Sequence, residues 1–587
     1  MMIMKQMLEA LQLKRKNTGT KQLKTIWGEQ IDKEHVLEEY PRPQMVRDNY
    51  TILNGIYQYA FTGSSEMPSC YDGEILVPFS PETEMSGVGR QLQPNEYLWY
   101  ERSFILEQLP KGKRLLLHFG ACDERCRVYI NGEQVGTHAG GYQAFYFDIT
   151  AFIKEGENKL QVCVKDVSDT SYHGRGKQKL KNGGMFYTAQ SGIWQTVWYE
   201  WVPEIYVQSM HIIPHFDEDS VEIELFTNEE GKFLPYKVYI FDRGHLISEM
   251  SIEDGHKMML PIPNKKAWSP VSPFLYDVTI MYGEDFIQSY FGMRHFSVEK
   301  DSNGILRLCL NHVPYFQNGI LDQGYWPESL LTPISDEAMI YDIQEAKNQG
   351  FNMIRKHCKI EPMRWYYHCD RLGMLVWQDM INGGVEYNPF KTTYIPTVIR
   401  KLQQLKDSHH VFHGRANAKG RKEWKKECIE TIEQLYNCTS ICTWVLFNEG
   451  WGQFDAEENT QMVLEKDNTR IIDSHSGWFD QGAGDMRSVH IYFFELAVEK
   501  GLNKPFVISE YGGLAYGVKE HSYSEDIYGY ANYENATDYK KAYKEMMDKI
   551  QKLKREGLAA AVYTQLADVE EEVNGILTYD RKISKLD

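Results

Sequence analysis

The stretch SICTWVLFNE, residues 440–449, is an apolar run that ends in the polar pair Asn448-Glu449. A run without the alternation of a half-exposed strand is typical of a parallel strand buried on both faces. Residues 505–510, PFVISE, repeat this pattern and end in Glu510. Both runs lie in the C-terminal half of the chain, and they indicate the fold class of that half.

Six further apolar runs surround these two. The eight predicted strands are residues 315–320, 351–356, 374–379, 440–449, 469–474, 488–493, 505–510 and 558–565. Helical periodicity separates them, most clearly over residues 336–348 and 539–555. Eight parallel βα units predict a (β/α)8 TIM barrel. The alternative is an open doubly wound sheet, but no G-x-G-x-x-G loop or P-loop follows any run.

The N-terminal part of the chain has a different pattern. Residues 45–203 consist of short alternating runs bounded by turn residues, which predicts a β-sandwich. Within it, Asn131-Gly132 separates VYI from EQVG, and this dipeptide favours a tight hairpin. Residues 204–297 repeat the alternation over a shorter length, so we expect a second, smaller sandwich before the barrel.

The composition limits which molecules the protein can bind and in which cellular compartment it is expected. The chain has 64 basic and 82 acidic residues, a net charge of −18 that repels phosphate backbones and anionic lipid. No apolar stretch has the length of a membrane span, and the first thirty residues lack a signal-peptide core. The ten cysteines form no paired framework. We therefore expect a cytoplasmic protein with free thiols that binds neither nucleic acid nor membrane.

Two carboxylates end predicted barrel strands. The catalytic groups of this fold come from the C-terminal ends of its strands, so Glu449 and Glu510 are expected to meet at the barrel mouth. Two facing carboxylates suit cleavage of a glycosidic bond, because one protonates the leaving oxygen while the other attacks the anomeric carbon. The alternative is that each glutamate caps the following helix.

Polar and aromatic residues accompany these carboxylates. Planar hydrogen-bonding groups and aromatic faces are what a sugar site requires, although any one tryptophan also fits simple loop packing. The other strand ends carry Asp322, Arg355, His357, Asp379, Asn448, Asp473, His490, Tyr492 and Gln565, and the loops beyond them carry Tyr325, Trp326, Trp451 and Trp478.

Two lysines beside the second strand leave two alternatives open. Lys356 and Lys359, in IRKHCK, fit recognition of a carboxylated sugar such as a galacturonide. A solvent-facing position for both lysines is the favoured alternative.

Metal-dependent and serine-dependent chemistry have no sequence support. The spacing of His118, Cys122 and Cys126 suggests zinc, but no second ligand pair follows. The three histidines 409, 410 and 413 lie in a polar link that predicts a solvated loop. Neither a G-x-S-x-G elbow nor an H-E-x-x-H helix is present. We therefore expect no metal and no cofactor.

Five motifs, in order, resemble glycoside hydrolase family 2, the group of β-galactosidases, β-glucuronidases and β-mannosidases. The motifs are YPRPQMVRDNYTILNG (40–55), SGIWQTVW (191–198), FGMRHFSV (291–298), WVLFNEGW (444–451) and PFVISEYGG (505–513). The resemblance implies an N-terminal extension (1–44), a jelly-roll sugar-binding domain (45–203), an immunoglobulin-like β-sandwich (204–297) and a catalytic barrel (298–587).

The resemblance also implies roles for the site residues. Glu449 matches the family's acid/base and Glu510 its nucleophile. Asn448 is expected to hold the 2-hydroxyl of the sugar, Tyr492 to hydrogen-bond the nucleophile, and Arg355 to keep Glu510 ionised. Glu449 then needs a raised pKa, so that it stays protonated until it is used.

Two departures from the family pattern bear on the sugar. Family glucuronidases read the sugar carboxylate with an Asn-x-Lys element, whereas here Asn574 is followed by Gly575 and Ile576. The eighth strand ends in Tyr563-Thr564-Gln565, where many members have tryptophan.

The sequence therefore predicts a retaining exo-β-glycosidase with a β-galactoside as the leading substrate. A β-hexuronidase, acting on a galacturonide or a glucuronide, is the alternative within the family. A non-catalytic carbohydrate-binding protein is the alternative from another class. Family members are often dimers or tetramers, and the sequence leaves the oligomeric state open.

Overall fold

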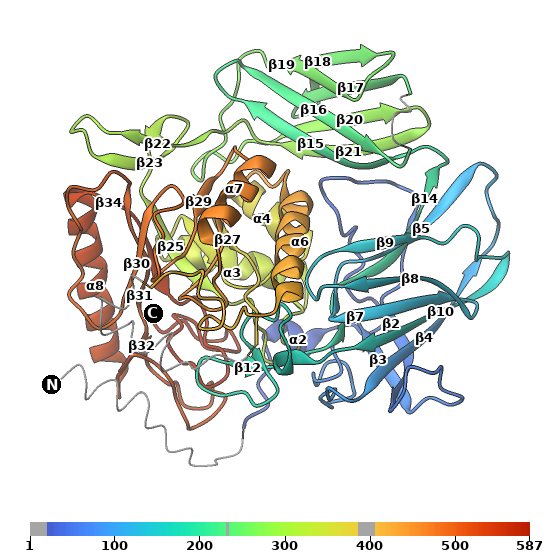
Figure 1. The fold of residues 1–587 in the computed structure, drawn as a ribbon, viewed down its shortest axis with the longest axis horizontal. Helices are drawn as coiled ribbons and strands as arrows, with labels where there is room; N and C mark the ends of the chain where they lie inside the picture. The colour runs from blue at the N-terminus through green and yellow to red at the C-terminus, as the bar shows by residue number, and fades with distance from the viewer. Residues whose placement is uncertain (1–19, 230–233, 386–404) are drawn as a thin grey trace.

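The structure is a computed structural model that describes residues 20–229, 234–385 and 405–587. Figure 1 shows its three parts: a sandwich of strands from the first third of the chain (blue to cyan), a smaller sandwich (green), and a barrel (yellow to red) that contacts both. A short helix, α2 (Ile26–Gln30), precedes the first sandwich.

Two antiparallel sheets form the first sandwich. The four-stranded sheet has the order β1 (Tyr50–Ile52), β14 (Val197–Pro203), β5 (Lys113–Phe119) and β9 (Phe145–Asp148); the six-stranded sheet has the order β3 (Gly73–Val77), β2 (Gly55–Thr62), β4 (Tyr97–Leu106), β10 (Gly156–Lys165), β7 (Arg125–Ile130) and β8 (Glu133–Ala139). The predicted hairpin joins β7 to β8, and both Asn131 (φ 52°) and Gly132 (φ 85°) have the positive φ that its turn requires.

The second sandwich is smaller and is also antiparallel. Its sheets are β15 (Val207–His215), β16 (Ser220–Thr227) and β19 (Lys257–Pro261), against β18 (His245–Ile252), β17 (Tyr236–Asp242), β20 (Tyr276–Tyr282) and β21 (Asp285–Phe291). A three-stranded sheet of β22 (Phe296–Lys300), β23 (Leu306–Leu310) and β24 (Val313–Pro314) leads from it to the barrel.

Eight parallel strands form a nearly closed barrel. They are β25 (Gln317–Asp322), β26 (Met353–Lys356), β27 (Leu375–Asp379), β28 (Ile441–Val445), β29 (Ile471–Asp473), β30 (Arg487–Ile491), β31 (Phe506–Gly512) and β34 (Leu558–Thr564). The sheet order is β29-β28-β27-β26-β25-β34-β31-β30, so the first strand pairs with both the second and the last. An open doubly wound sheet does not have this pairing. The predicted fold class, two sandwiches followed by a TIM barrel, is confirmed.

Helices cover most of the barrel. They are α3 (Asp336–Asn348), α4 (Met363–Leu372), α6 (Ala418–Leu435), α7 (Ala456–Lys466) and α8 (Ala536–Glu556). The predicted helix 336–348 coincides with α3, which begins because the Ser335 side chain accepts a hydrogen bond from the Ala338 N–H and two acidic residues occupy the first turn. The predicted helix 539–555 lies inside α8. Residues 474–486 and 492–505 contain no helix, so the barrel wall after its fifth and sixth strands is built from loops.

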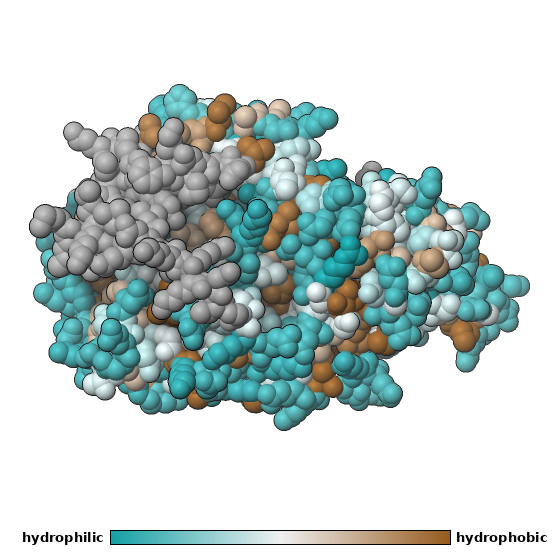
Figure 2. Space-filling view, turned by 90° about the horizontal axis from the view of Figure 1, so that it is seen from below, coloured by the Kyte–Doolittle hydropathy of each residue, from teal (hydrophilic) through white to brown (hydrophobic). Residues whose placement is uncertain are grey.

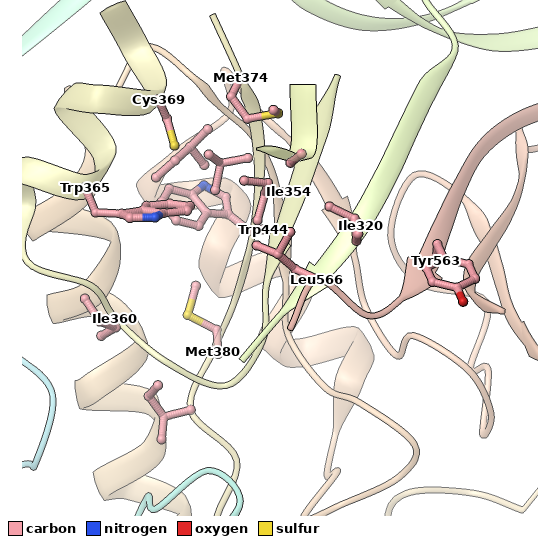
Figure 3. Close-up of a cluster of buried hydrophobic side chains, with 14 of the residues drawn as sticks. Ile320, Ile354, Ile360, Trp365, Cys369, Met374, Met380, Trp444, Tyr563 and Leu566 are labelled. Atoms are coloured by element: carbon pink, nitrogen blue, oxygen red, sulfur yellow. The ribbon is translucent and has the colours of Figure 1, made fainter. Parts of the chain in front are cut away.

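The barrel core lies between the strands and these helices. Figure 3 shows Trp365 of α4 and Trp444 of β28 packed together beside Ile354 of β26 and Met374, which directly precedes β27. All four side chains are buried. Because apolar residues from strands and helices meet here, the strand ends that carry the site are fixed by packing on both sides.

We propose that the domain boundaries follow those expected from the sequence. The interval between β14 and β15 supports a boundary near residue 203. The interval between β21 and β22, residues 292–295, supports a boundary just before the expected residue 297.

The surface and the cysteines agree with the composition. Hydrophilic residues dominate the face shown in Figure 2, where hydrophobic residues form only small groups. Within the described residues, no helix combines the length and the apolar character needed to cross a bilayer. All ten cysteines are free thiols, as expected.

Replacement of a barrel-core side chain tests the packing between the barrel strands and the helices around them. Ile354→Ala, at a fully buried position of β26, removes three buried carbons, and we expect it to lower the free energy of unfolding by about 2–5 kcal/mol. Ile105→Ala is the matched control, because Ile105 of β4 is 69% exposed. Urea unfolding of both variants gives the comparison, and equal effects of the two substitutions would show that the described core is wrong.

Candidate functional site

Arg355 occupies the centre of the barrel mouth. It lies on β26, its side chain is fully buried, and its guanidinium uses all five N–H donors. Nε and Nη2 donate to the two carboxylate oxygens of Asp379 at 2.9 and 3.0 Å. Nη2 also donates to Oδ1 of Asn448 at 2.9 Å, and Nη1 donates to the Ser509 carbonyl at 3.1 Å and to Glu510 at 3.0 Å. One cation therefore links three strands and the segment that follows β28.

Glu510 lies on β31 with its carboxylate buried. Oε1 accepts from Arg355, and Oε2 accepts a short hydrogen bond from the Tyr492 hydroxyl. Burial alone raises the pKa of this carboxyl, but the neighbouring His490 and Arg355 side chains and the hydrogen bond from Tyr492 outweigh burial and hold the pKa below its ordinary value. Glu510 is therefore ionised at neutral pH.

Glu449 follows β28 in an unusual backbone conformation. The predicted strand 440–449 ends at Val445, and Glu449 has a φ of 52°, a value that non-glycine residues seldom adopt. Its backbone N–H donates to the Ser476 carbonyl at 2.9 Å, which fixes the turn. Such strain is often found at functional sites. The result is that the side chain of Glu449 turns towards His490.

His490 stands between the two glutamates. Its Nδ1 is 3.0 Å from Oε1 of Glu449, and its Nε2 is 3.6 Å from Oε1 of Glu510 and 3.0 Å from Oγ of Ser476. One oxygen of each carboxylate and one ring nitrogen all lie within 4.8 Å of one another. Facing carboxylates about 5 Å apart allow one to act as nucleophile, whereas pairs separated by about 6.5–9.5 Å leave room for a water. The described pair fits the closer arrangement.

The orientation of the Asn448 amide follows from its partner. Arg355 can only donate, so the atom of Asn448 that it contacts is the carbonyl oxygen. No described residue accepts a hydrogen bond from the Asn448 amide nitrogen, so this nitrogen can donate to a ligand.

His357 also belongs to this group of residues. It is buried, and its Nδ1 lies 2.6 Å from Oδ2 of Asp379, the same carboxylate that holds Arg355. The structure thus brings together sequence-predicted side chains that lie on, or directly after, β26, β27, β28, β30 and β31.

Two sets of side chains in this region have the spacing of metal ligands. They are Glu449 with His490 and Glu510, and His357 with Cys358 and Asp379. The Arg355 guanidinium contacts a carboxylate of each set, and its positive charge opposes a further cation there. The expectation that no metal is needed therefore stays a prediction.

The prediction that Lys356 and Lys359 face solvent is wrong. Both are buried: Nζ of Lys356 is 2.5 Å from Asp322 and 2.7 Å from Glu361, and Nζ of Lys359 is 2.8 Å from Glu361. The Lys356 side chain also lies over Trp365 of α4, because it alternates with Arg355 along a strand covered on both faces. Asp322 is therefore paired within the protein.

Gln565 and Asn574 form the eighth-strand side of the site. Nε2 of Gln565 donates to Oδ1 of Asn574 at 2.8 Å, and Nδ2 of Asn574 donates to Glu572 at 2.9 Å. Oε1 of Gln565 is buried without a hydrogen-bond partner among the described residues. Ile576, at the position of the family's lysine, is buried in the core.

The aromatic side chains line the loops beyond the strands. Trp451 stacks on Phe186 with ring centroids 5.5 Å apart, and the edge of Trp478 meets His490 at 5.2 Å. Tyr492 stacks on Tyr530 at 4.0 Å. Tyr325 packs instead against Tyr187, and Trp326 against Trp27, so these two residues have packing partners in the described structure.

A loop of the first sandwich reaches the barrel mouth, which the motifs did not predict. Gly174 pairs with Gly383 beyond β27, and Arg175 donates from Nη1 to the Gly384 carbonyl at 2.6 Å. Further along the loop, the Tyr187 hydroxyl hydrogen-bonds Glu572. Figure 1 shows β12 (Tyr187–Thr188) beneath the barrel. The only sequence signal was the polar, glycine-rich segment SYHGRGKQ.

Asp123 of the first sandwich contacts this loop. Its carboxylate accepts from Gln178 at 3.0 Å and so supports the loop.

The prediction of a solvated loop is wrong for one of the three clustered histidines. His409 is exposed and His410 lies 2.9 Å from Asp455, but His413 is buried with Nδ1 3.2 Å from the Gly450 carbonyl. The polar composition of this link concealed that one side chain packs against the residue next to Glu449.

The proteins to which this chain is similar are glycoside hydrolases. The family model of the sugar binding domain of glycosyl hydrolases family 2 matches residues 88–203. A β-galactosidase from Priestia megaterium is 23% identical over 489 residues, covering 78% of this chain and 43% of that protein. A β-galactosidase from Thermoanaerobacter pseudethanolicus is 26% identical over 301 residues, covering 48% and 39%. The chain thus spans less than half the length of these relatives.

Solved structures share the fold. A β-glucuronidase of an uncultured Clostridium sp. has a TM-score of 0.71 at 19% identity, covering 92% of this chain and 97% of that one. A β-galacturonidase from Eisenbergiella tayi bound to galacturonate has a TM-score of 0.69 at 19% identity, covering 93% and 97%. With the family model and the curated relatives, these matches confirm the resemblance to glycoside hydrolase family 2.

The hydrogen bond between Tyr492 and Glu510 has a measurable consequence. Tyr492→Phe removes a donor to the ionised carboxylate, so we expect the pKa of Glu510 to rise towards its usual value. Carbon-13 NMR of glutamate-labelled protein measures this pKa, with Glu510→Gln identifying the signal. Tyr239→Phe, in the second sandwich, is the control. An unchanged pKa in Tyr492→Phe would remove Tyr492 from the electrostatics of the site.

Proposed function

We propose that this chain is a retaining, exo-acting β-glycosidase of glycoside hydrolase family 2. The observation that carries the proposal is the pair Glu449 and Glu510, which meet at the barrel mouth within 4.8 Å while only Glu510 contacts an arginine. The loop of the first sandwich across the barrel mouth supports cleavage of terminal sugars.

In the first step Glu510 is the nucleophile. Its ionised carboxylate attacks the anomeric carbon while Glu449 gives its proton to the glycosidic oxygen, so the C–O bond to the leaving group breaks and a glycosyl ester forms on Glu510. The Tyr492 and Arg355 contacts orient the attacking oxygen. Asn448, whose amide oxygen is taken by Arg355, holds the 2-hydroxyl of the sugar with its amide nitrogen.

In the second step the ester is hydrolysed. Glu449, now ionised, takes a proton from a water molecule, and the water oxygen attacks the anomeric carbon and releases Glu510. Two inversions at this carbon give net retention. His490, in contact with Glu449 and close to Glu510, orients Glu449 for both proton transfers.

The similar proteins differ in the sugars that their names record. The curated relatives above are β-galactosidases, and the solved structures are a β-glucuronidase and a β-galacturonidase. The activity proposed for this chain is therefore hydrolysis of a β-glycoside, with a neutral galactoside or a hexuronide as substrate.

Removal of the nucleophile tests the reaction directly. Glu510→Gln leaves no group to form the ester, and we expect kcat on p-nitrophenyl β-glycosides to fall by about 10⁴-fold or more. Glu520→Gln is the matched control, because the Glu520 side chain is 71% exposed. Wild-type kcat in Glu510→Gln would refute the assignment. If the wild-type chain binds sugars but hydrolyses no β-glycoside, it is a carbohydrate-binding protein instead.

Removal of the proton donor gives a different result. Glu449→Gln is expected to lower kcat by about 10²–10⁴-fold on substrates with poor leaving groups, because these need protonation most. The loss on activated dinitrophenyl glycosides should be much smaller in the first step. Rates on a series of aryl glycosides measure this, and equal losses across the series would exclude Glu449 as the acid.

A further inference from the structure

Lys177 has no charged partner in the described structure. This lysine of the first sandwich is 8% exposed and makes no hydrogen bond or ion pair through its ammonium group with any described residue. The ammonium lies near two aromatic rings: Nζ is 5.6 Å from the Trp451 ring centroid and 5.7 Å from that of Tyr187. These contacts are too weak to replace a carboxylate.

The other buried lysines are all neutralised. Four lysines are buried in the described part of the chain. Lys356 and Lys359 pair with Glu361, and Lys585 lies 2.6 Å from Asp568. A mostly buried lysine is usually paired with an anion, or its ammonium is kept for a ligand. Lys177 therefore differs from the other buried lysines, each of which is paired with a carboxylate.

The loop that carries Lys177 is held in place. The backbone N–H groups of Arg175 and Gly176 both donate to the Asn382 carbonyl at 2.9 Å. On the other side, Nε2 of Gln178 donates to the Tyr142 hydroxyl at 2.8 Å. Lys177 is therefore fixed between the first sandwich and the barrel.

This fixed position is close to the proposed catalytic residues. Trp451, which the ammonium approaches, follows Glu449 by two residues. Burial and, next in size, the charge of Lys177 lower the pKa of His357, which lies beside Arg355. A sugar between Glu449 and Glu510 would thus have a positive charge on the side of its ring that faces the loop.

We propose that Lys177 binds the carboxylate of a uronic acid, so that the substrate is a β-hexuronide. This rests on the proposed glycosidase function and names its substrate class. The other candidates for carboxylate recognition are occupied or absent: Lys356 and Lys359 are paired with Asp322 and Glu361, and Ile576 replaces the family's lysine. A neutral galactoside would leave the Lys177 ammonium unpaired.

Variants of Lys177 test the inference on p-nitrophenyl β-galactoside, β-glucuronide, β-galacturonide and 6-O-sulfo-β-galactoside. We expect the wild-type protein to prefer one of the two uronides. Lys177→Met should lower kcat/KM on that uronide by about 10- to 100-fold, the value of a hydrogen bond to a charged group, and should lower it on the galactoside much less. Lys177→Arg, which keeps the charge, should retain more uronide activity than Lys177→Met.

Lys181→Met is the matched control, because Lys181 is an exposed lysine of the same segment. It should leave kcat/KM on every substrate unchanged. Thermal unfolding of each variant separates loss of the carboxylate contact from loss of the fold.

The outcomes separate this inference from the proposed function. A preference for the neutral galactoside, or equal losses on both sugars in Lys177→Met, would overturn the uronide inference and leave the glycosidase intact. A preference for the sulfated sugar would also overturn it. If no glycoside is hydrolysed, the proposed function fails, and calorimetry of galacturonate and glucuronate binding decides the inference: tighter binding than galactose that is lost in Lys177→Met supports it, and equal binding refutes it.

Discussion

The buried guanidinium of Arg355 is the interaction on which the site depends. Removing a cation from water costs several kcal/mol, and the cost is recovered only where opposite charges and hydrogen bonds surround it. Arg355 meets both conditions, since Asp379 and Glu510 supply the charge and all five N–H groups have acceptors. Because these acceptors lie on β27, on β31 and in the segment after β28, satisfying one side chain fixes the relative positions of Glu510, Asn448 and Asp379.

The same contacts give the carboxylates of Glu510 and Glu449 different chemical surroundings. Glu510 receives Arg355 and Tyr492, which stabilise its ionised form. Glu449, in the described structure, contacts the His490 ring and no lysine or arginine. Pairs of acids in unequal surroundings are how one fold provides a nucleophile and a proton donor together. The first sandwich completes the arrangement, because its loop brings Lys177 and aromatic rings to the barrel mouth.

Much of this could be predicted from the sequence because barrel strands have a local signature. Apolar runs that end in polar residues located the eight strands and placed Arg355, Glu449 and Glu510 at one end of the barrel. This signature does not show which other residues a strand-end side chain contacts in the folded protein. Lys356 looked solvent-facing because the strand pattern does not show that Glu361 and Trp365, which follow the strand, fold back onto its side chain. Lys177 was missed because no local pattern reports that a loop about 270 residues earlier in the chain packs against Trp451.

The most direct test of the account is to trap the covalent intermediate. A 2-deoxy-2-fluoro β-glycosyl fluoride of the sugar hydrolysed fastest slows both steps, but its good leaving group lets the first proceed, so the ester accumulates. Mass spectrometry of the intact protein should show the mass of one fluorosugar added, peptide mapping should place it on Glu510, and Glu510→Gln should show no adduct. An adduct on another residue, or rapid turnover of the natural sugar with no adduct formed, would contradict the assignment of Glu510 as the nucleophile.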